Sequence, residues 1–154
     1  MPNDSNSMSA NKEIVHRYID DCWNLGKLDE IRELVADTCT HHDSVFPSLQ
    51  AGADNLKHHI AMCRNGFPDF QFTIDDTIAE RNEVVIHWTC VGTHKGQFLS
   101  MAPTNRQATI TGTSIFRLEG GKIVEGWSDW NLMSMMQQLG VAAPSLRSDA
   151  KMRT

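Results

Sequence analysis

The sequence predicts a single α+β domain in which helices come first along the chain and strands follow. Apolar residues recur at three- and four-residue steps as far as Gly66, and they alternate with polar residues beyond Pro68. The chain has 154 residues, 40% of them hydrophobic, which is enough for one core of ordinary size. We therefore expect one domain over residues 11–141, preceded by flexible residues 1–10 and followed by a polar tail over 142–154.

Three helices are predicted in the first half of the chain, each from an apolar stripe with helical spacing. The first begins at the candidate N-cap Asn11 and ends before Gly26. A second, shorter helix is expected over residues 28–35, and a short extended segment follows over 38–45. The third helix is expected to end near Gly66.

An antiparallel sheet is predicted in the second half, because apolar and polar residues alternate there. The alternation on both sides of Arg81-Asn82 indicates a long hairpin. A second hairpin turns at Gly120-Gly121, since two glycines supply the positive φ angles that tight turns require. A short closing helix is expected over residues 133–139.

Composition and motif spacing argue against several classes of partner. The net charge is -5 and no run of Lys or Arg occurs, so we expect no nucleic-acid partner. The N-terminal residues do not resemble a secretory signal and no apolar run is long enough to span a bilayer, which predicts a cytoplasmic protein without a membrane partner. The four cysteines form no C-x-x-C pair, and the histidines form no H-x-x-H motif. We therefore expect no metal.

Four segments of the sequence resemble those of the SnoaL-like polyketide cyclases, also called ester cyclases, a branch of the nuclear-transport-factor-2-like superfamily. They are FPDFQFTIDD, WTCVGTHKGQFLSMAPTNR, SIFRLEGGKIVEGW and QQLG, and their order extends the resemblance over roughly residues 12–141. The resemblance implies a cone-shaped α+β barrel, with N-terminal helices packed on a strongly curved antiparallel sheet around an apolar ligand-binding pocket. It also implies a homodimer formed by the outer faces of the sheets.

The activity implied by this resemblance is cofactor-free enolate chemistry on a small apolar carbonyl compound, either ring closure by intramolecular aldol reaction or isomerisation. Characterised cyclases use an aspartate on the last long strand as acid and base. Ungapped matching of GKIVE and QQLG places Ser128 at that position, and Asn131 where a second aspartate is usual. Two alternatives therefore stay open, a non-catalytic ligand-binding protein and an epoxide or ester hydrolase.

Asp129 and His42 are the candidate catalytic residues. Burial of Asp129 between Trp127 and Trp130 would raise its pKa toward the range useful for proton transfer, but only a bulge near Trp127 would turn it inward. Otherwise Asp129 faces solvent or pairs with a basic side chain. Adjacent residues of a strand point to opposite faces, so one of His41 and His42 faces the pocket, and we favour His42. Its alternative is a hydrogen-bonded strand edge.

The candidate substrate-binding residues are hydroxyl, aromatic and imidazole side chains of the predicted strands and the loop between them. Each has a structural alternative as a core or sheet residue. The histidines of the third helix, His58 and His59, are expected on the surface. The candidates are Ser128, Ser114, Trp88, Phe98, Trp130 and His94.

Overall fold

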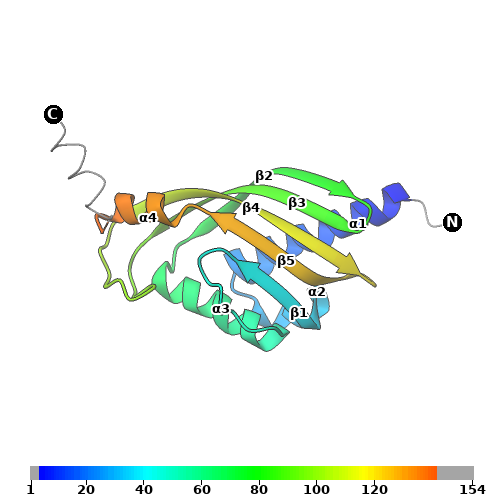
Figure 1. The fold of residues 1–154 in the computed structure, drawn as a ribbon, viewed down its shortest axis with the longest axis horizontal. Helices are drawn as coiled ribbons and strands as arrows, with labels where there is room; N and C mark the ends of the chain where they lie inside the picture. Colours follow the sequence, from blue (N-terminus) through cyan, green and yellow to red (C-terminus); the bar gives the residue numbers. More distant parts are fainter. Residues whose placement is uncertain (1–3, 142–154) are drawn as a thin grey trace.

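The computed structural model describes residues 4–141 and contains four α-helices packed on a five-stranded sheet (Figure 1). The α-helices are α1 (Asp4–Arg17), α2 (Ile31–Leu34), α3 (Ala53–Gly66) and α4 (Leu132–Leu139). A π-helix η1 (Tyr18–Asn24) continues α1, and a 3₁₀ turn η2 (Leu28–Glu30) precedes α2. The strands are β1 (Val35–Asp43), β2 (Gln71–Glu80), β3 (Glu83–Thr93), β4 (Gln107–Glu119) and β5 (Lys122–Trp130).

The strand order is β1-β5-β4-β3-β2, and the sheet is open rather than closed into a barrel. The pairs of β2 with β3, β3 with β4 and β4 with β5 are antiparallel, as predicted. The pair of β1 with β5 is parallel, so the expectation of a wholly antiparallel sheet is wrong. The chain between these strands is long enough to return β5 beside β1 in the same direction, which parallel pairing requires. The α+β fold class is confirmed.

The helical part of the chain differs from its prediction at the start of the first helical segment and over residues 28–35, whereas that first segment ends before Gly26 as predicted. Helix α1 begins at Asp4 rather than at Asn11, and its continuation η1 ends at Asn24. Residues 28–35 contain a 3₁₀ turn and only a short α-helix, because the backbone is already extended at Val35. The predicted tail over 142–154 lies outside the described residues.

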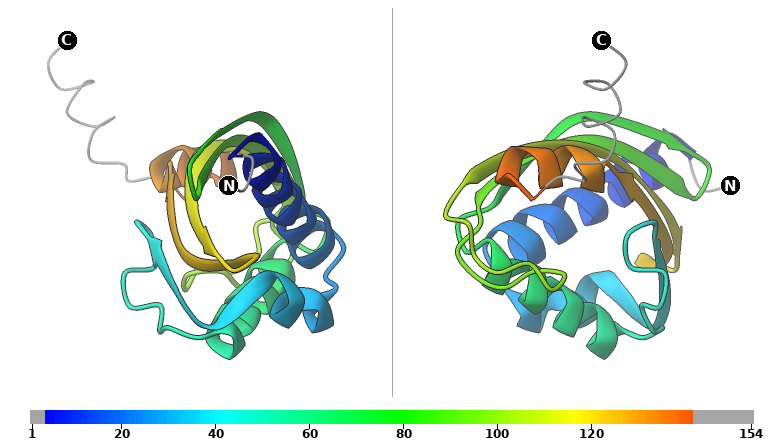
Figure 2. Two further views of the ribbon diagram at one scale, coloured as in Figure 1. Left: turned by 90° about the vertical axis from the view of Figure 1, so that its right-hand side faces the viewer. Right: turned by 60° about the vertical axis from the view of Figure 1, so that its left-hand side comes forward.

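The core lies between the helices and the concave face of the sheet, which is strongly curved in Figure 2. Alternation along β3 turns Val84, Ile86 and Trp88 inward, and all three are buried. Across the core, the ring of Tyr18 meets that of Phe116 edge to face, with their centroids 5.7 Å apart. The helices thus cover the apolar face of the sheet.

The same alternation assigns the residues of β5 to the two faces of the sheet. Pairing of β4 with β5 shifts register between Arg117 and Leu118, and the register then runs without interruption to Trp130. The shift therefore lies before Trp127, not beside it.

None of the helices described between residues 4 and 141 is long and apolar enough to cross a membrane.

Candidate functional site

A cavity of about 110 Å³ lies between the helices and the concave face of the sheet. Its size is of the same order as the roughly 150 Å³ apolar cavity that holds a benzene ring in another protein. Its walls are rich in aromatic rings, which come from the π-helix η1, the loops and four strands. These rings belong to Trp23, Phe46, Phe67, Phe70, Phe72, Trp88, Phe98, Phe116 and Trp130.

A chain of hydrogen bonds crosses the sheet wall of this cavity, with one residue from each of four neighbouring strands. The indole N–H of Trp88 donates to Ser114 Oγ over 3.0 Å. The hydroxyls of Ser114 and Ser128 are 2.8 Å apart, and Ser128 Oγ lies 3.3 Å from His41 Nε2. If the neutral imidazole carries its proton on Nδ1, each hydroxyl donates to the next group and the chain ends at His41 Nε2.

The imidazole of His41 is held in that neutral state by its surroundings. Burial, with smaller contributions from nearby His59 and His42, lowers the pKa of His41 to about 4. The ring packs against the backbone of Gly126, where a Cβ atom would lie 2.8 Å from His41 Nδ1. Glycine at position 126 therefore makes room for the inward-facing histidine.

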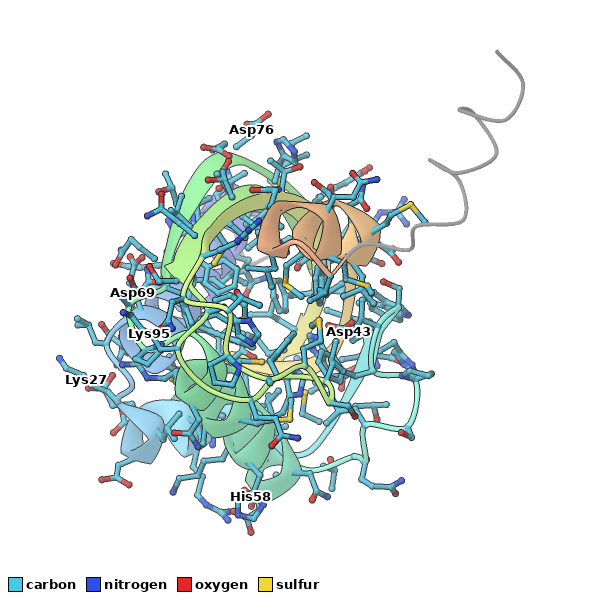
Figure 3. The ribbon with its side chains drawn as sticks, turned by 90° about the vertical axis from the view of Figure 1, so that its left-hand side faces the viewer. Lys27, Asp43, His58, Asp69, Asp76 and Lys95 are labelled. Carbon is cyan, nitrogen blue, oxygen red and sulfur yellow. The ribbon has the colours of Figure 1, made fainter. Side chains whose placement is uncertain are left out.

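Asp43 is the carboxylate that lines the cavity, and Figure 3 shows it beside β1 and β5. Its Oδ1 accepts a hydrogen bond from the amide of Val45 over 2.8 Å, and the Trp130 indole N–H lies 3.3 Å from the same atom. Burial raises the pKa of Asp43, although these hydrogen bonds oppose the shift. In the parallel register Asp43 pairs directly with Ser128, so the carboxyl and the hydroxyl side chains lie side by side.

Neither catalytic candidate from the sequence lies on the cavity wall. Asp129 is exposed, because the register near Trp127 is regular and alternation turns its neighbours Ser128 and Trp130 inward instead. His42 is also exposed and stacks on Trp127, with Nε2 2.8 Å from a Glu125 carboxylate oxygen. The preference for His42 over His41 is therefore wrong, and the condition for an inward Asp129, a bulge near Trp127, is not met.

Five of the six substrate-binding candidates do line the cavity, namely Ser114, Ser128, Trp88, Phe98 and Trp130. His94 does not. Its ring is fully buried and stacks on Phe67, while His94 Nδ1 lies 3.1 Å from the Thr104 hydroxyl. His94 therefore organises the loop between β3 and β4.

Sequence reasoning missed two further polar residues of the cavity, Tyr18 and His59. His59 is buried between Phe46 and Trp23, contrary to the surface prediction, whereas His58 is exposed and points away from α3 in Figure 3. Burial lowers the pKa of His59 to about 4. Tyr18 and His59 each lie on the apolar stripe of a helix, and this position was the sequence signal that could have identified them as cavity residues.

The buried histidines predict a fold that loses stability in acid. His41 and His59 have folded-state pKa values of about 4, below the ordinary 6.5 of an unfolded chain. The unfolded state therefore binds more protons between these pH values, and the free energy of unfolding should fall by a few kcal/mol as pH decreases from 6.5 toward 4. Denaturant unfolding across this range measures the effect. His59→Gln should reduce the slope, and an unchanged slope would contradict the assignment.

The polar groups of the cavity are those of proton-transfer chemistry, a carboxylate with a raised pKa beside hydroxyls and a neutral imidazole. Within residues 4–141, no three His, Cys, Asp or Glu side chains are grouped as metal ligands would be.

Comparison with solved structures finds the same fold in several proteins, two of which are described as putative polyketide cyclases. A putative SnoaL-like polyketide cyclase from Jannaschia sp. CCS1 superposes with a TM-score of 0.82 and 23% identity, covering 94% of this chain and 100% of that one. TsrD from Streptomyces laurentii superposes with a TM-score of 0.79 and 20% identity, covering 86% of this chain and 96% of that one. IdmH, a putative polyketide cyclase from Streptomyces antibioticus, superposes with a TM-score of 0.75 and 25% identity, covering 85% of this chain and 99% of that one. A search of curated proteins finds no match.

The sequence itself also matches a family description. Residues 13–139, which extend from within α1 to the end of α4, match the SnoaL-like polyketide cyclase family. The resemblance that the sequence motifs indicate is thereby confirmed. The chain belongs to the SnoaL-like polyketide cyclase family.

Proposed function

We propose that this protein is a cyclase- or isomerase-type enzyme that removes a proton next to the carbonyl of a small, largely apolar compound, without a metal or cofactor. The base is Asp43. The observation that carries this proposal is the direct pairing of Asp43 with Ser128, the position at which the resemblance implies a catalytic aspartate. The carboxylate that is absent at position 128 of β5 is supplied from β1 at the same level of the sheet.

The environment of Asp43 suits a general base. Burial raises its pKa, which makes the carboxylate a stronger proton acceptor than an exposed one, while the Trp130 indole and the Val45 amide hold it in place. Aromatic walls exclude water and hold an apolar substrate over the carboxylate.

In the proposed reaction Asp43 takes a proton from the carbon next to the carbonyl. The C–H electron pair moves into the carbonyl group and forms an enolate, whose oxygen needs a hydrogen-bond donor. In ring closure the enolate carbon then attacks a second carbonyl, and the protonated Asp43 returns its proton to the new alkoxide. In isomerisation the proton returns to a different carbon.

Exchange of protons for deuterium tests the proposal without knowledge of the natural substrate. Acetophenone in D₂O should lose its methyl proton signal faster with the protein than with the same protein after heat denaturation, as followed by proton NMR. Its size suits a cavity that admits about one aromatic ring. Binding of acetophenone without faster exchange would instead favour the second candidate, a non-catalytic ligand-binding protein, which the serine at position 128 supports.

The hydrolase alternative receives less support from the cavity. Positioning a water molecule for hydrolysis needs a cluster of carboxylates, and Asp43 is the one carboxylate among the described residues that line the cavity. Glu125, the other candidate on β5, points away from it and pairs with His42 and Arg117.

We further propose that two copies of the chain associate through the convex face of the sheet. One row of side chains crosses all five strands on that face, with each neighbouring pair in register. Ile78, at the β2 end of the row, is 61% exposed. Such an apolar band favours burial against a second copy. The row consists of Ile78, Val85, Ile115, Trp127 and His42.

Light scattering should therefore give twice the mass of one chain at micromolar concentration. Ile115→Lys places a charge at the centre of the band and should produce monomers, since burying an unpaired charge is costly. His58→Lys, on the exposed side of α3, is the matched control and should remain dimeric. A monomer mass for the unaltered protein would refute the dimer.

A further inference from the structure

The hydroxyl of Tyr18 is buried and its O–H has no acceptor among the described residues, because the nearby indole N–H of Trp23 can only donate to it. The side chain is 1% exposed and lines the cavity from the helical side, opposite the sheet. A buried hydroxyl that lost its water partners on folding costs free energy unless another group or a water molecule replaces them. The phenol of Tyr18 therefore needs a partner from within the cavity.

The backbone that carries Tyr18 is irregular at this point. Tyr18 begins the π-helix η1, where the turns are wider, and the Leu25 amide donates to the Asp20 carbonyl five residues earlier over 3.2 Å. Single π-helical turns are rare and recur at functional sites, because they redirect side chains at a cost in regular hydrogen bonding. This is a second observation, independent of the unpartnered hydroxyl.

Packing fixes the direction of the phenol ring. Phe116 meets it edge to face, at an interplanar angle of 75°. Burial also raises the pKa of the Tyr18 phenol, so it remains a neutral donor at physiological pH. Asp43 and Ser128 lie on the sheet wall of the cavity. The proposed function assigns proton removal to Asp43, and the hydroxyl of Ser128 lies beside it.

We infer that the Tyr18 hydroxyl donates a hydrogen bond to the carbonyl oxygen of the bound compound, and thereby positions the neighbouring carbon over Asp43. The inference rests on the proposed function insofar as a carbonyl compound occupies this cavity. It adds a donor from the helical wall, and it assigns the carbonyl oxygen to that wall rather than to Ser128 on the sheet.

A pair of probes of nearly equal shape tests the inference. Acetophenone has a carbonyl group where α-methylstyrene has a CH₂ group, so only the first can accept a hydrogen bond. Tyr18→Phe keeps the ring and removes the hydroxyl. Calorimetric titration should show acetophenone binding weakened by about 5- to 10-fold, the effect of one net hydrogen bond, with α-methylstyrene binding unchanged. The infrared carbonyl stretch of bound acetophenone should also shift to higher frequency in the variant.

The matched control is Ser128→Ala, which removes a hydroxyl from the sheet wall. It should leave the carbonyl stretch of bound acetophenone unchanged. The inference is overturned if Ser128→Ala shifts the carbonyl stretch and Tyr18→Phe does not. It is also overturned if Tyr18→Phe weakens the binding of both probes equally. In either case the proposed function stands. If the unaltered protein binds neither probe, the inference falls together with the proposed ligand class. Selective weakening without any catalysed deuterium exchange would support the Tyr18 contact and refute the proposed enzyme activity.

Discussion

Asp43→Asn is expected to slow deuterium exchange into acetophenone by about 10²- to 10⁴-fold, the usual share of a general base. Asparagine keeps the size of the side chain and still accepts the hydrogen bonds from Val45 and Trp130, but it cannot take the proton. Acetophenone affinity should therefore change little. Proton NMR measures the rate, and calorimetry measures the affinity.

A second substitution makes this prediction specific to the position of the carboxylate. Because Asp43 and Ser128 pair in register, Ser128→Asp in the Asp43→Asn background places a carboxylate on the same wall, and part of the lost rate should return. Asp129→Asn is the control. It changes an exposed carboxylate on the opposite face and should leave the rate unaltered. Full exchange activity in folded Asp43→Asn would exclude Asp43 as the base.

Gly112→Ala is expected to lower the free energy of unfolding by about 1–3 kcal/mol, the usual cost of overpacking a core. Gly112 lies opposite Trp88 in the pair of β3 with β4, and the indole ring rests on its backbone. A Cβ atom there would lie 2.6 Å from Cη2 and 2.7 Å from Cε2 of that ring, so the indole must move. Denaturant unfolding measures the change.

Two further variants separate the clash from a general effect of altering β4. Trp88→Phe in the Gly112→Ala background provides a smaller ring, and the double variant should be less destabilised than the sum of the two single changes. Thr111→Ala, at the adjacent exposed position, should change stability by no more than about 0.5 kcal/mol. Additive single changes would indicate that Gly112 does not make room for Trp88.

The order of helices and strands was predictable because it depends on local patterns. The turn at Arg81-Asn82 and that at Gly120-Gly121 lie where the glycines and the alternation of apolar residues indicate them. The parallel partner of β1 was not predictable in this way. Its pairing with β5 joins residues such as Asp43 and Ser128, which are far apart in the sequence, and no local period encodes such a contact.

The sequence by itself therefore determined the α+β fold, the family and five of the residues that line the cavity, because apolar periodicity and motif order are properties of the chain. Only the tertiary structure decided which carboxylate and which histidine face inward. Asp129 and His42 differ from their inward neighbours by one residue, and a shift of one residue in a strand exchanges the two faces. The regular register of β5 from Glu125 to Trp130 and its parallel pairing with β1 settled the choice, and they placed His41 and Asp43 in the cavity.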